Sequence, residues 1–462
     1  MSDESAVLVW CIFSAVVWVV IGSVIARRRE DGLHPAAIFC MLFALSYPLK
    51  LFATSYGFAS LDSSMLDVEW RLGALGLANV SAAMFVLPVA LGARPVHREL
   101  RHAEEPDPWR KSAAVGWLLT AMALLVASYG FDSLWQILSF EALTELRKQR
   151  DQSRLFSAPA ALMRDAGTFC LITHLGVVIR GWTSLGHGLR LSYLLSWGAF
   201  TYVLLAISGS KYMGLLFFGI VVLVANVVNI ERHGRGFRLS RTAVWGIIAF
   251  VGIGLTGYLR GFGEIPTADG FIIAALIQTA YAFDAPDNLS FILSRAENWW
   301  TGDLAFAPTL QYMFLGAIPR ALWRDKPLVM GNLYIMQRYL PERFTDETGE
   351  VVNPSMAGEM LLSGGLWFVV FWSLILGVMF MLVYRWAQTH RGSRVALALN
   401  VWLSLNVFNL LRSGTGIVSP LVTFTVMSTV VLVTSKLAVT IARRAALTED
   451  QLIGDRSVAA RH

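Results

Sequence analysis

Residues 5–25 of this chain read SAVLVWCIFSAVVWVVIGSVI, an uninterrupted apolar run that is followed by Arg27–Arg29. A helix needs about 20 apolar residues to cross the hydrocarbon core of a bilayer, so this run is long enough to span a membrane. A signal peptide carries its positive charge before the apolar stretch and a small-residue cleavage site after it. Here acidic residues, Asp3 and Glu4, come first and the positive charge follows. We therefore expect a retained helix.

The composition of the whole chain agrees with a membrane protein. Of 462 residues, 55% are hydrophobic and only 15% are charged, whereas a soluble domain carries about 25% charged residues. The net charge of +6 does not indicate nucleic acid, because most basic residues lie in short segments between apolar runs, where membrane orientation explains them. Cys11, Cys40 and Cys170 lie inside apolar runs, so a disulfide framework is not expected.

Apolar runs of similar length recur along the chain, and they predict about eleven transmembrane helices. The candidate spans are residues 5–25, 36–56, 74–93, 113–130, 159–179, 191–208, 214–230, 242–259, 365–384, 395–411 and 416–434. An open sheet cannot satisfy its backbone in lipid, so the predicted fold class is all-α. We expect a polytopic membrane helix bundle, a single integral membrane domain over residues 1–462, with one large helical loop at residues 260–364.

Lys and Arg residues are distributed unevenly between the two sides of this arrangement. If the C-terminal end of the first span is inside, the inner loops carry more than twice as many of them as the short outer loops. This bias predicts an N-terminus outside, a cytoplasmic tail at residues 435–462, and an extracytoplasmic position for residues 260–364.

The large loop contains a short basic cluster. Residues 318–327 read IPRALWRDKP, and Arg320 and Arg324 are four apart, which places them on one face of a helix. The arginine fork matches phosphate oxygens two at a time, and Lys326 adds a point charge. The cluster is a candidate phosphate site; the alternative is a solvated basic face paired with Asp325.

A second candidate site residue is a carboxylate that lies about one turn before the predicted span at 365–384. Residues 354–359 read PSMAGE, in which Ser355 can cap a short helix and Glu359 lies just beyond its first turn. One interpretation is a capping arrangement with Glu359 near the positive end of the helix dipole. The other is a general base, a partly buried carboxylate that takes the proton from an attacking sugar hydroxyl.

Further charges lie in or beside the predicted spans, where ionisable side chains are costly and indicate function by default. For Lys50, after Pro48 in the second span, the simplest expectation is a side chain that snorkels to the interface. Arg164 and Asp165 interrupt the fifth span. By the predicted topology, five cations belong to the outer half of the membrane: Lys50, Arg164, Lys211, Arg260 and Arg412. Because they share this side, we expect them to surround one cavity that holds a diphosphate.

Other chemistries lack their residues in this sequence. There is no GxxxxGK[ST] stretch for an ATPase and no His/Cys cluster with metal-ligand spacing. By the predicted topology, the eight histidines lie on the cytoplasmic side or within a span. A base on the outer face is therefore expected to be a carboxylate, a tyrosine or a less usual group.

Several features together resemble one protein family. They are the many spans, the large outer loop before the last few helices, and the stretches 319–327 and 354–359 followed by Gly364-Gly365. It is the Wzy-type polysaccharide polymerases of bacterial envelopes, which make O-antigen and exopolysaccharide. Residues 208–211, SGSK, are similar to a Gly-Ser-Arg turn of such proteins, with Lys in place of Arg. The topology resembles the family over most of the chain, the sequence over a small part of it.

The resemblance implies a GT-C-type fold in the bacterial cytoplasmic (inner) membrane, with a periplasmic N-terminus and no metal, nucleotide sugar or other cofactor. The implied substrate is an oligosaccharide repeat unit on undecaprenyl diphosphate, polymerised at the periplasmic face. Expected partners are membrane lipid, a chain-length regulator and a flippase, without nucleic acid. Glu359 is the expected general base. The cations expected to hold the diphosphate are Arg320, Arg324, Lys326, Arg260, Arg412 and Lys211.

Other activities stay open at this point. A lipid-linked oligosaccharide ligase shares the family's plan but is expected to use a histidine in the large outer loop, and residues 260–364 contain none. A secondary transporter or flippase of envelope glycolipids also carries intramembrane charges, typically near the midplane and in matching halves, which this sequence does not have. A non-catalytic scaffold would point Arg320, Arg324 and Glu359 in unrelated directions.

Overall fold

Helices form every regular element in the part of the chain that the structure, a computed structural model, describes. That part comprises residues 3–54, 67–92, 154–181, 213–242, 285–303, 354–390, 393–412 and 421–437, with short pieces at 113, 115–120, 123, 244 and 440–441.

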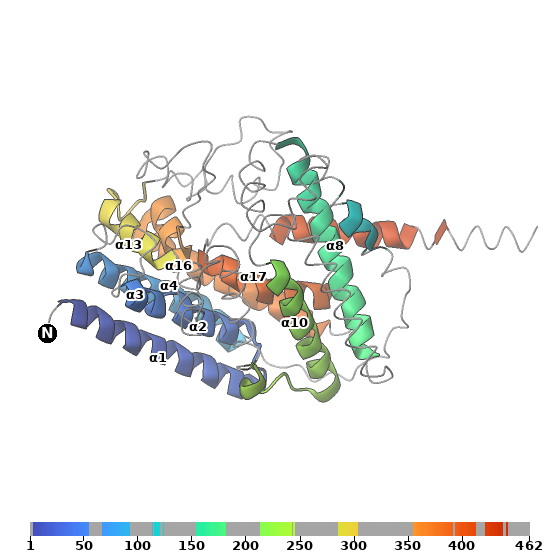
Figure 1. The fold of residues 1–462 in the computed structure, drawn as a ribbon, viewed down its shortest axis with the longest axis horizontal. Coiled ribbons are helices and arrows are strands. Elements are labelled where there is room, and N and C mark those ends of the chain that lie inside the picture. The colour runs from blue at the N-terminus through green and yellow to red at the C-terminus, as the bar shows by residue number, and fades with distance from the viewer. Residues whose placement is uncertain are drawn as a thin grey trace, which may run out of the picture.

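The N-terminal third of the fold is a layer of antiparallel helices (Figure 1). It contains α1 (Asp3–Arg29), α2 (Pro35–Ser46), α3 (Pro48–Thr54) and α4 (Val68–Gly92). The predicted second span is broken between α2 and α3, because Pro48 has no backbone N–H to continue the helical hydrogen bonds.

The C-terminal helices pack against this layer. They are α16 (Met356–Thr389) and α17 (Arg394–Arg412), flanked by α8 (Arg154–Arg180) and α10 (Met213–His233). Helices α4 and α16 approach closely because small residues line their contact: a side chain at Gly377 would overlap the Phe85 carbonyl, and the Ser81 and Ser373 hydroxyls bond at 2.8 Å. Small residues are the usual means of close helix approach in membranes.

Six of the described helices are long and apolar enough to cross a membrane. They correspond to the spans predicted at 5–25, 36–56, 74–93, 159–179, 365–384 and 395–411. Helix α10 coincides with the span at 214–230, and a shorter apolar helix, Leu421–Leu437, with the span at 416–434. The spans at 191–208 and 242–259, and most of 113–130, fall outside the described residues. The all-α membrane class is confirmed.

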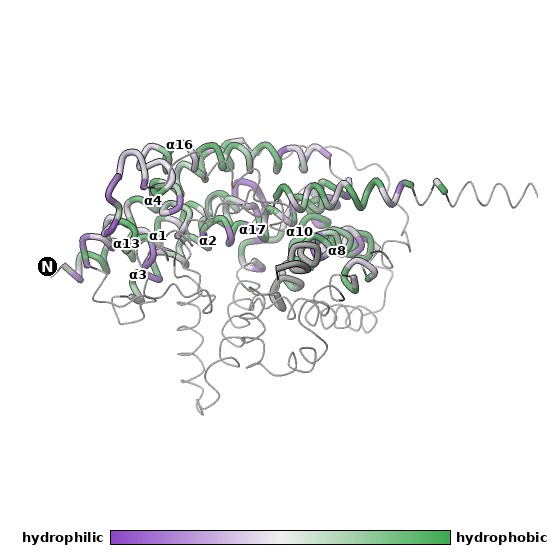
Figure 2. Tube along the Cα trace, turned by 90° about the horizontal axis from the view of Figure 1, so that it is seen from above, coloured by the Kyte–Doolittle hydropathy of each residue, from purple (hydrophilic) through white to green (hydrophobic). Residues whose placement is uncertain are grey.

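Large apolar side chains remain exposed along the middle of several helices, among them Phe13 and Val20 on α1 and Phe371 on α16. Figure 2 shows the hydrophobic colour continuing along α16. A soluble protein does not leave apolar surface of this extent in water, whereas lipid covers it at no cost.

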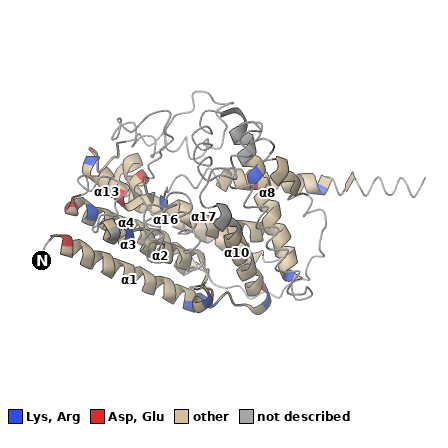
Figure 3. Ribbon diagram, viewed as in Figure 1, with Lys and Arg blue, Asp and Glu red and all other residues tan. Residues whose placement is uncertain are grey.

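Charged residues lie mostly near the ends of the helices (Figure 3). At the end that we call the Glu359 end, Arg71 of α4 pairs with Glu4 of α1, and Trp70 packs against Trp299. At the opposite Arg29 end, Arg180 of α8 pairs with Glu231 of α10 at 2.9 Å. Residues that the charge bias assigned to one side of the membrane therefore share one end of the fold.

Helix α16 bends sharply at two glycines. Gly365 has φ 73° and ψ −170°, a conformation that favours glycine, and a side chain there would overlap the Trp300 carbonyl. Beyond the bend, Ser373 Oγ lies 3.4 Å from Met360 Sδ, although 13 residues separate them. Along a straight helix that separation would be about 20 Å. Residues 356–363 therefore fold back against the rest of α16 as a short helix.

Candidate functional site

The short helix at residues 356–363 carries Glu359, the predicted base. Ser355 caps it: the Ser355 hydroxyl is buried and accepts a hydrogen bond from the Gly358 backbone N–H at 2.9 Å. Glu359 lies in the first turn and is only 5% exposed. The capping role predicted for Ser355 is confirmed, while the catalytic role of Glu359 stays a prediction.

A second helix supports this segment from the side. It is α13 (Ala285–Arg295), whose residues 285–293 are all buried. The absence of a side chain at Gly358 leaves room for Leu289 and Ile292 of α13, which a Cβ there would contact at 3.3 and 2.8 Å. Figure 1 shows α13, α3 and the start of α16 together at the N-terminal end of α1. Three segments that are far apart in sequence thus converge at the Glu359 end.

A buried ion pair joins α13 to α3. Lys50 Nζ lies 3.1 Å from Asp287 Oδ2, and the two side chains are 1% and 0% exposed. The Thr54 hydroxyl donates a hydrogen bond of 2.7 Å to the other carboxylate oxygen of Asp287. The expectation that Lys50 snorkels to the membrane interface is therefore wrong. A buried ammonium is stable only when a carboxylate compensates its lost hydration, and Asp287 supplies that compensation.

Asp287 was not among the site residues predicted from the sequence. The signal that was present, Pro286-Asp287-Asn288, is typical of the start of a helix, with proline and an acidic residue in the first turn. That pattern predicts the helix but not the partner of its carboxylate, because the partner lies in a different predicted span.

Arg412, the last residue of α17, is the one predicted diphosphate ligand within the described residues. The Tyr47 hydroxyl donates a hydrogen bond to the carbonyl of the adjacent Leu411 at 3.4 Å, which places the end of α17 near the α2–α3 break. Its guanidinium lies 5.6 Å from the centre of the Phe408 ring. Its Nε is buried and, among the described residues, has no hydrogen-bond partner. Arg412 therefore has a donor available at this end of the fold.

The other predicted ligands, Arg320, Arg324, Lys326, Arg260 and Lys211, lie outside the described residues, so the diphosphate clamp as a whole stays a prediction.

Two cations that were expected to join this clamp have carboxylate partners instead. Lys50 pairs with Asp287, and Arg164 lies 3.5 Å from Asp165, which also accepts a hydrogen bond of 3.2 Å from Thr423. A cation that neutralises a neighbouring carboxylate contributes little to a ring of diphosphate ligands. A contribution of Lys50 and Arg164 to the clamp therefore stays a prediction.

Within the described ranges, no group of three His, Cys, Asp or Glu side chains is arranged to hold a metal ion. Comparison of the chain with protein-family models, curated proteins and solved structures finds no match. A function must therefore be inferred from the residues themselves.

Proposed function

We propose that this chain is a Wzy-type polysaccharide polymerase, a metal-independent membrane glycosyltransferase. It joins oligosaccharide repeat units carried on undecaprenyl diphosphate at the periplasmic face of the bacterial inner membrane. It crosses that membrane about eleven times, with its N-terminus in the periplasm and its C-terminus in the cytoplasm. The observation that carries the proposal is a carboxylate, Glu359, buried on a capped short helix at one end of the membrane helices.

The connectivity supports a basic site near this carboxylate. The described segments that precede and follow the cluster at 318–327 in the sequence, residues 285–303 and 354–363, both lie at the Glu359 end. On one side, the Trp299 carbonyl accepts a hydrogen bond of 2.8 Å from Leu366 N at the α16 bend. On the other, Ser355 caps the helix of Glu359. We propose that Arg320 and Arg324 lie near Glu359, together with Arg412 as a third cation.

In the proposed reaction, a hydroxyl at the non-reducing end of one lipid-linked unit attacks the anomeric carbon of the chain held on another. Glu359 accepts the hydroxyl proton as the new C–O bond forms. The bond between the anomeric carbon and the diphosphate oxygen breaks, and lipid diphosphate leaves with the electron pair. Because this leaving group is already activated, the protein mainly positions the two units and stabilises the charge that develops on the diphosphate. Arg412, Arg320 and Arg324 provide that stabilisation.

The test replaces Glu359 with Gln, which keeps the shape of the side chain and removes its basicity. Polymer formation from purified lipid-linked repeat units should fall by a factor of about 10² to 10⁴, the usual contribution of general acid–base catalysis. The control is Glu69→Gln, since Glu69 is an exposed acid in the first turn of α4 at the same end. Both variants should accumulate and unfold like the parent protein. Polymer of normal amount and length from Glu359→Gln would reject Glu359 as the base.

A further inference from the structure

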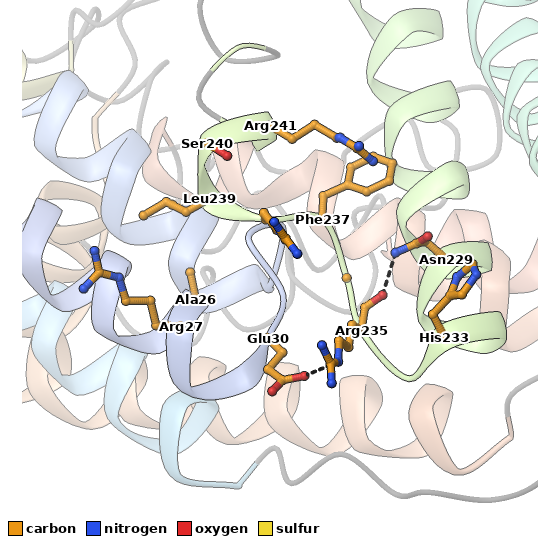
Figure 4. A pocket seen from close by; sticks show the side chains of 12 residues that line it. Ala26, Arg27, Glu30, Asn229, His233, Arg235, Phe237, Leu239, Ser240 and Arg241 are labelled. Carbon is orange, nitrogen blue, oxygen red and sulfur yellow. Dashed lines mark hydrogen bonds and ion pairs between the residues drawn. The ribbon is translucent and has the colours of Figure 1, made fainter.

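A pocket of about 760 Å³ lies at the Arg29 end, away from Glu359 (Figure 4). Its walls are the C-terminal ends of α1 and α10 and the segment that follows α10. Neither of the two predicted site residues that the structure describes, Glu359 and Arg412, lines it. The lining residues are Ala26, Arg27, Glu30, Asn229, His233, Arg235, Gly236, Phe237, Arg238, Leu239, Ser240 and Arg241.

The backbone of this pocket is fixed by buried polar contacts. The Asn226 side chain accepts a hydrogen bond of 2.7 Å from Phe237 N and donates one of 3.0 Å to Asp31, and both Asn226 and Asp31 are buried. Backbone hydrogen bonds connect Gly236 N to the Glu30 carbonyl at 2.7 Å and Gly32 N to the Phe237 carbonyl at 2.8 Å. The segment after α10 is therefore held against the end of α1, and the pocket exists before any ligand binds.

The lining is strongly basic, with four arginines and one glutamate. Arg235 pairs with that glutamate, Glu30, at 3.1 Å, but the two side chains are 71% and 59% exposed. Such a solvated pair contributes little, so an anion can replace Glu30 as the partner of Arg235. Among the described residues, Arg27, Arg238 and Arg241 have no carboxylate partner. In Figure 4, Arg27 and Arg241 come from different walls of the pocket, the end of α1 and the segment after α10.

An apolar surface leads directly to this basic group. Val16, Val20 and Val24 of α1 are exposed and lie on the face that also carries Arg27, as expected from the helical repeat. A lipid whose acyl chain lies along these valines has its phosphate at Arg27. Inside the pocket, Leu239 and the other apolar lining residues continue the apolar surface. This combination suits a lipid better than a freely soluble phosphate.

We propose that this pocket binds the phosphate head group of an anionic membrane lipid. Arginine is the side chain best suited to phosphate, because its planar fork donates two hydrogen bonds to a pair of phosphate oxygens. Basic pockets at the ends of membrane helices are also where lipid head groups of negative charge are attracted. The site is distinct from Glu359 and does not depend on the function proposed above.

Arg27 and Arg28 allow a matched test, because they are adjacent and both exposed, but only Arg27 lines the pocket. The full chain is purified in dodecyl maltoside, and bound phosphatidylglycerol and phosphatidylcholine are measured by native mass spectrometry. Phosphatidylglycerol should bind at least about tenfold more tightly than zwitterionic phosphatidylcholine. Arg27→Gln should weaken the binding of phosphatidylglycerol roughly fivefold, which is the effect of one cation at an anionic surface. Adding Arg241→Gln should weaken that binding further. Arg28→Gln should change it less than about twofold.

Two results would overturn the proposal: equal binding of the two lipids, or an equal loss in Arg28→Gln and Arg27→Gln. A third arm adds inorganic diphosphate to the complex with phosphatidylglycerol. Failure of millimolar diphosphate to displace the lipid supports a lipid site. Displacement at concentrations similar to that of the lipid would instead assign the pocket to a soluble phosphate and reject the lipid as its ligand. All of the substituted side chains are exposed, so thermal unfolding without added lipid should be unchanged in every variant.

Discussion

Removal of one partner of the Lys50–Asp287 ion pair should destabilise the protein strongly. Lys50→Met keeps the length and the apolar stem of the side chain but removes the ammonium from the buried Asp287 carboxylate, to which the Thr54 hydroxyl still donates at 2.7 Å. Both side chains of the pair are almost fully buried. Loss of one member of such a pair costs about 3–5 kcal/mol, because an uncompensated charge stays in a medium of low dielectric constant. Asp287→Asn should cost a similar amount, since it leaves the Lys50 ammonium without its counterion.

The double variant Lys50→Met/Asp287→Asn separates the attraction of the pair from the penalty of an isolated charge. It places no charge at either position, and the new amide carbonyl at position 287 can still accept the Thr54 hydrogen bond. We expect it to lose only about 1 kcal/mol relative to the parent protein, so the coupling energy should be at least about 5 kcal/mol. Unfolding free energies of the four proteins in one detergent, from denaturant titration followed by circular dichroism, provide the measurement. Additive losses, or single-variant losses below about 1 kcal/mol, would contradict this account of the pair.

Two further predictions concern stability at other positions. Burial lowers the pKa of His34 to about 3 from its usual 6.5. The unfolded chain therefore binds the proton more readily, and the free energy of unfolding should decrease by up to about 1.4 kcal/mol per pH unit below pH 6.5. His34→Asn, which can still accept the capping hydrogen bond from Ala36 N, should remove that slope in thermal unfolding between pH 7 and 5; an unchanged slope would contradict the assignment. Gly365→Ala should cost about 1–3 kcal/mol, because φ is 73° and the new Cβ overlaps the Trp300 carbonyl. Gly76→Ala, on an open face of α4, is its control and should be neutral or slightly stabilising in the same thermal assay.

The helices of membrane-crossing length could be predicted from the sequence because their signal is local. An apolar run of the length of residues 5–25 has few alternatives to a membrane helix. The Ser355 cap could be predicted for the same reason, since a cap and its backbone N–H are only three residues apart. The bend in α16 also had a local signal, the pair Gly364-Gly365, although its direction depends on the loop at Trp300 that packs against it.

The neighbourhood of the candidate site could not be predicted in the same way. Thr54 and Asp287, which share a hydrogen bond, are 233 residues apart, and nothing near either of them specifies the other. Lys50 was expected at the interface because a lone lysine in an apolar helix usually extends to water. The opposite outcome follows from tertiary packing: α13 brings a carboxylate to Lys50, and that carboxylate makes burial of the ammonium favourable.

Helix α13 connects the ion pair to the proposed base, and this connection determines how an activity measurement on Lys50 must be interpreted. One side of α13 binds Lys50 through Asp287, and another packs Leu289 and Ile292 against Gly358, next to Glu359. Loss of polymer formation in Lys50→Met would therefore follow from displacement of α13 even if Lys50 never contacts substrate. The double variant Lys50→Met/Asp287→Asn distinguishes the two cases, because it restores the support of α13 without restoring the ammonium. Recovery of both stability and polymer would make Lys50 a structural partner of Asp287. Recovery of stability alone would mean that polymer formation needs the charged pair itself and not only the support of α13.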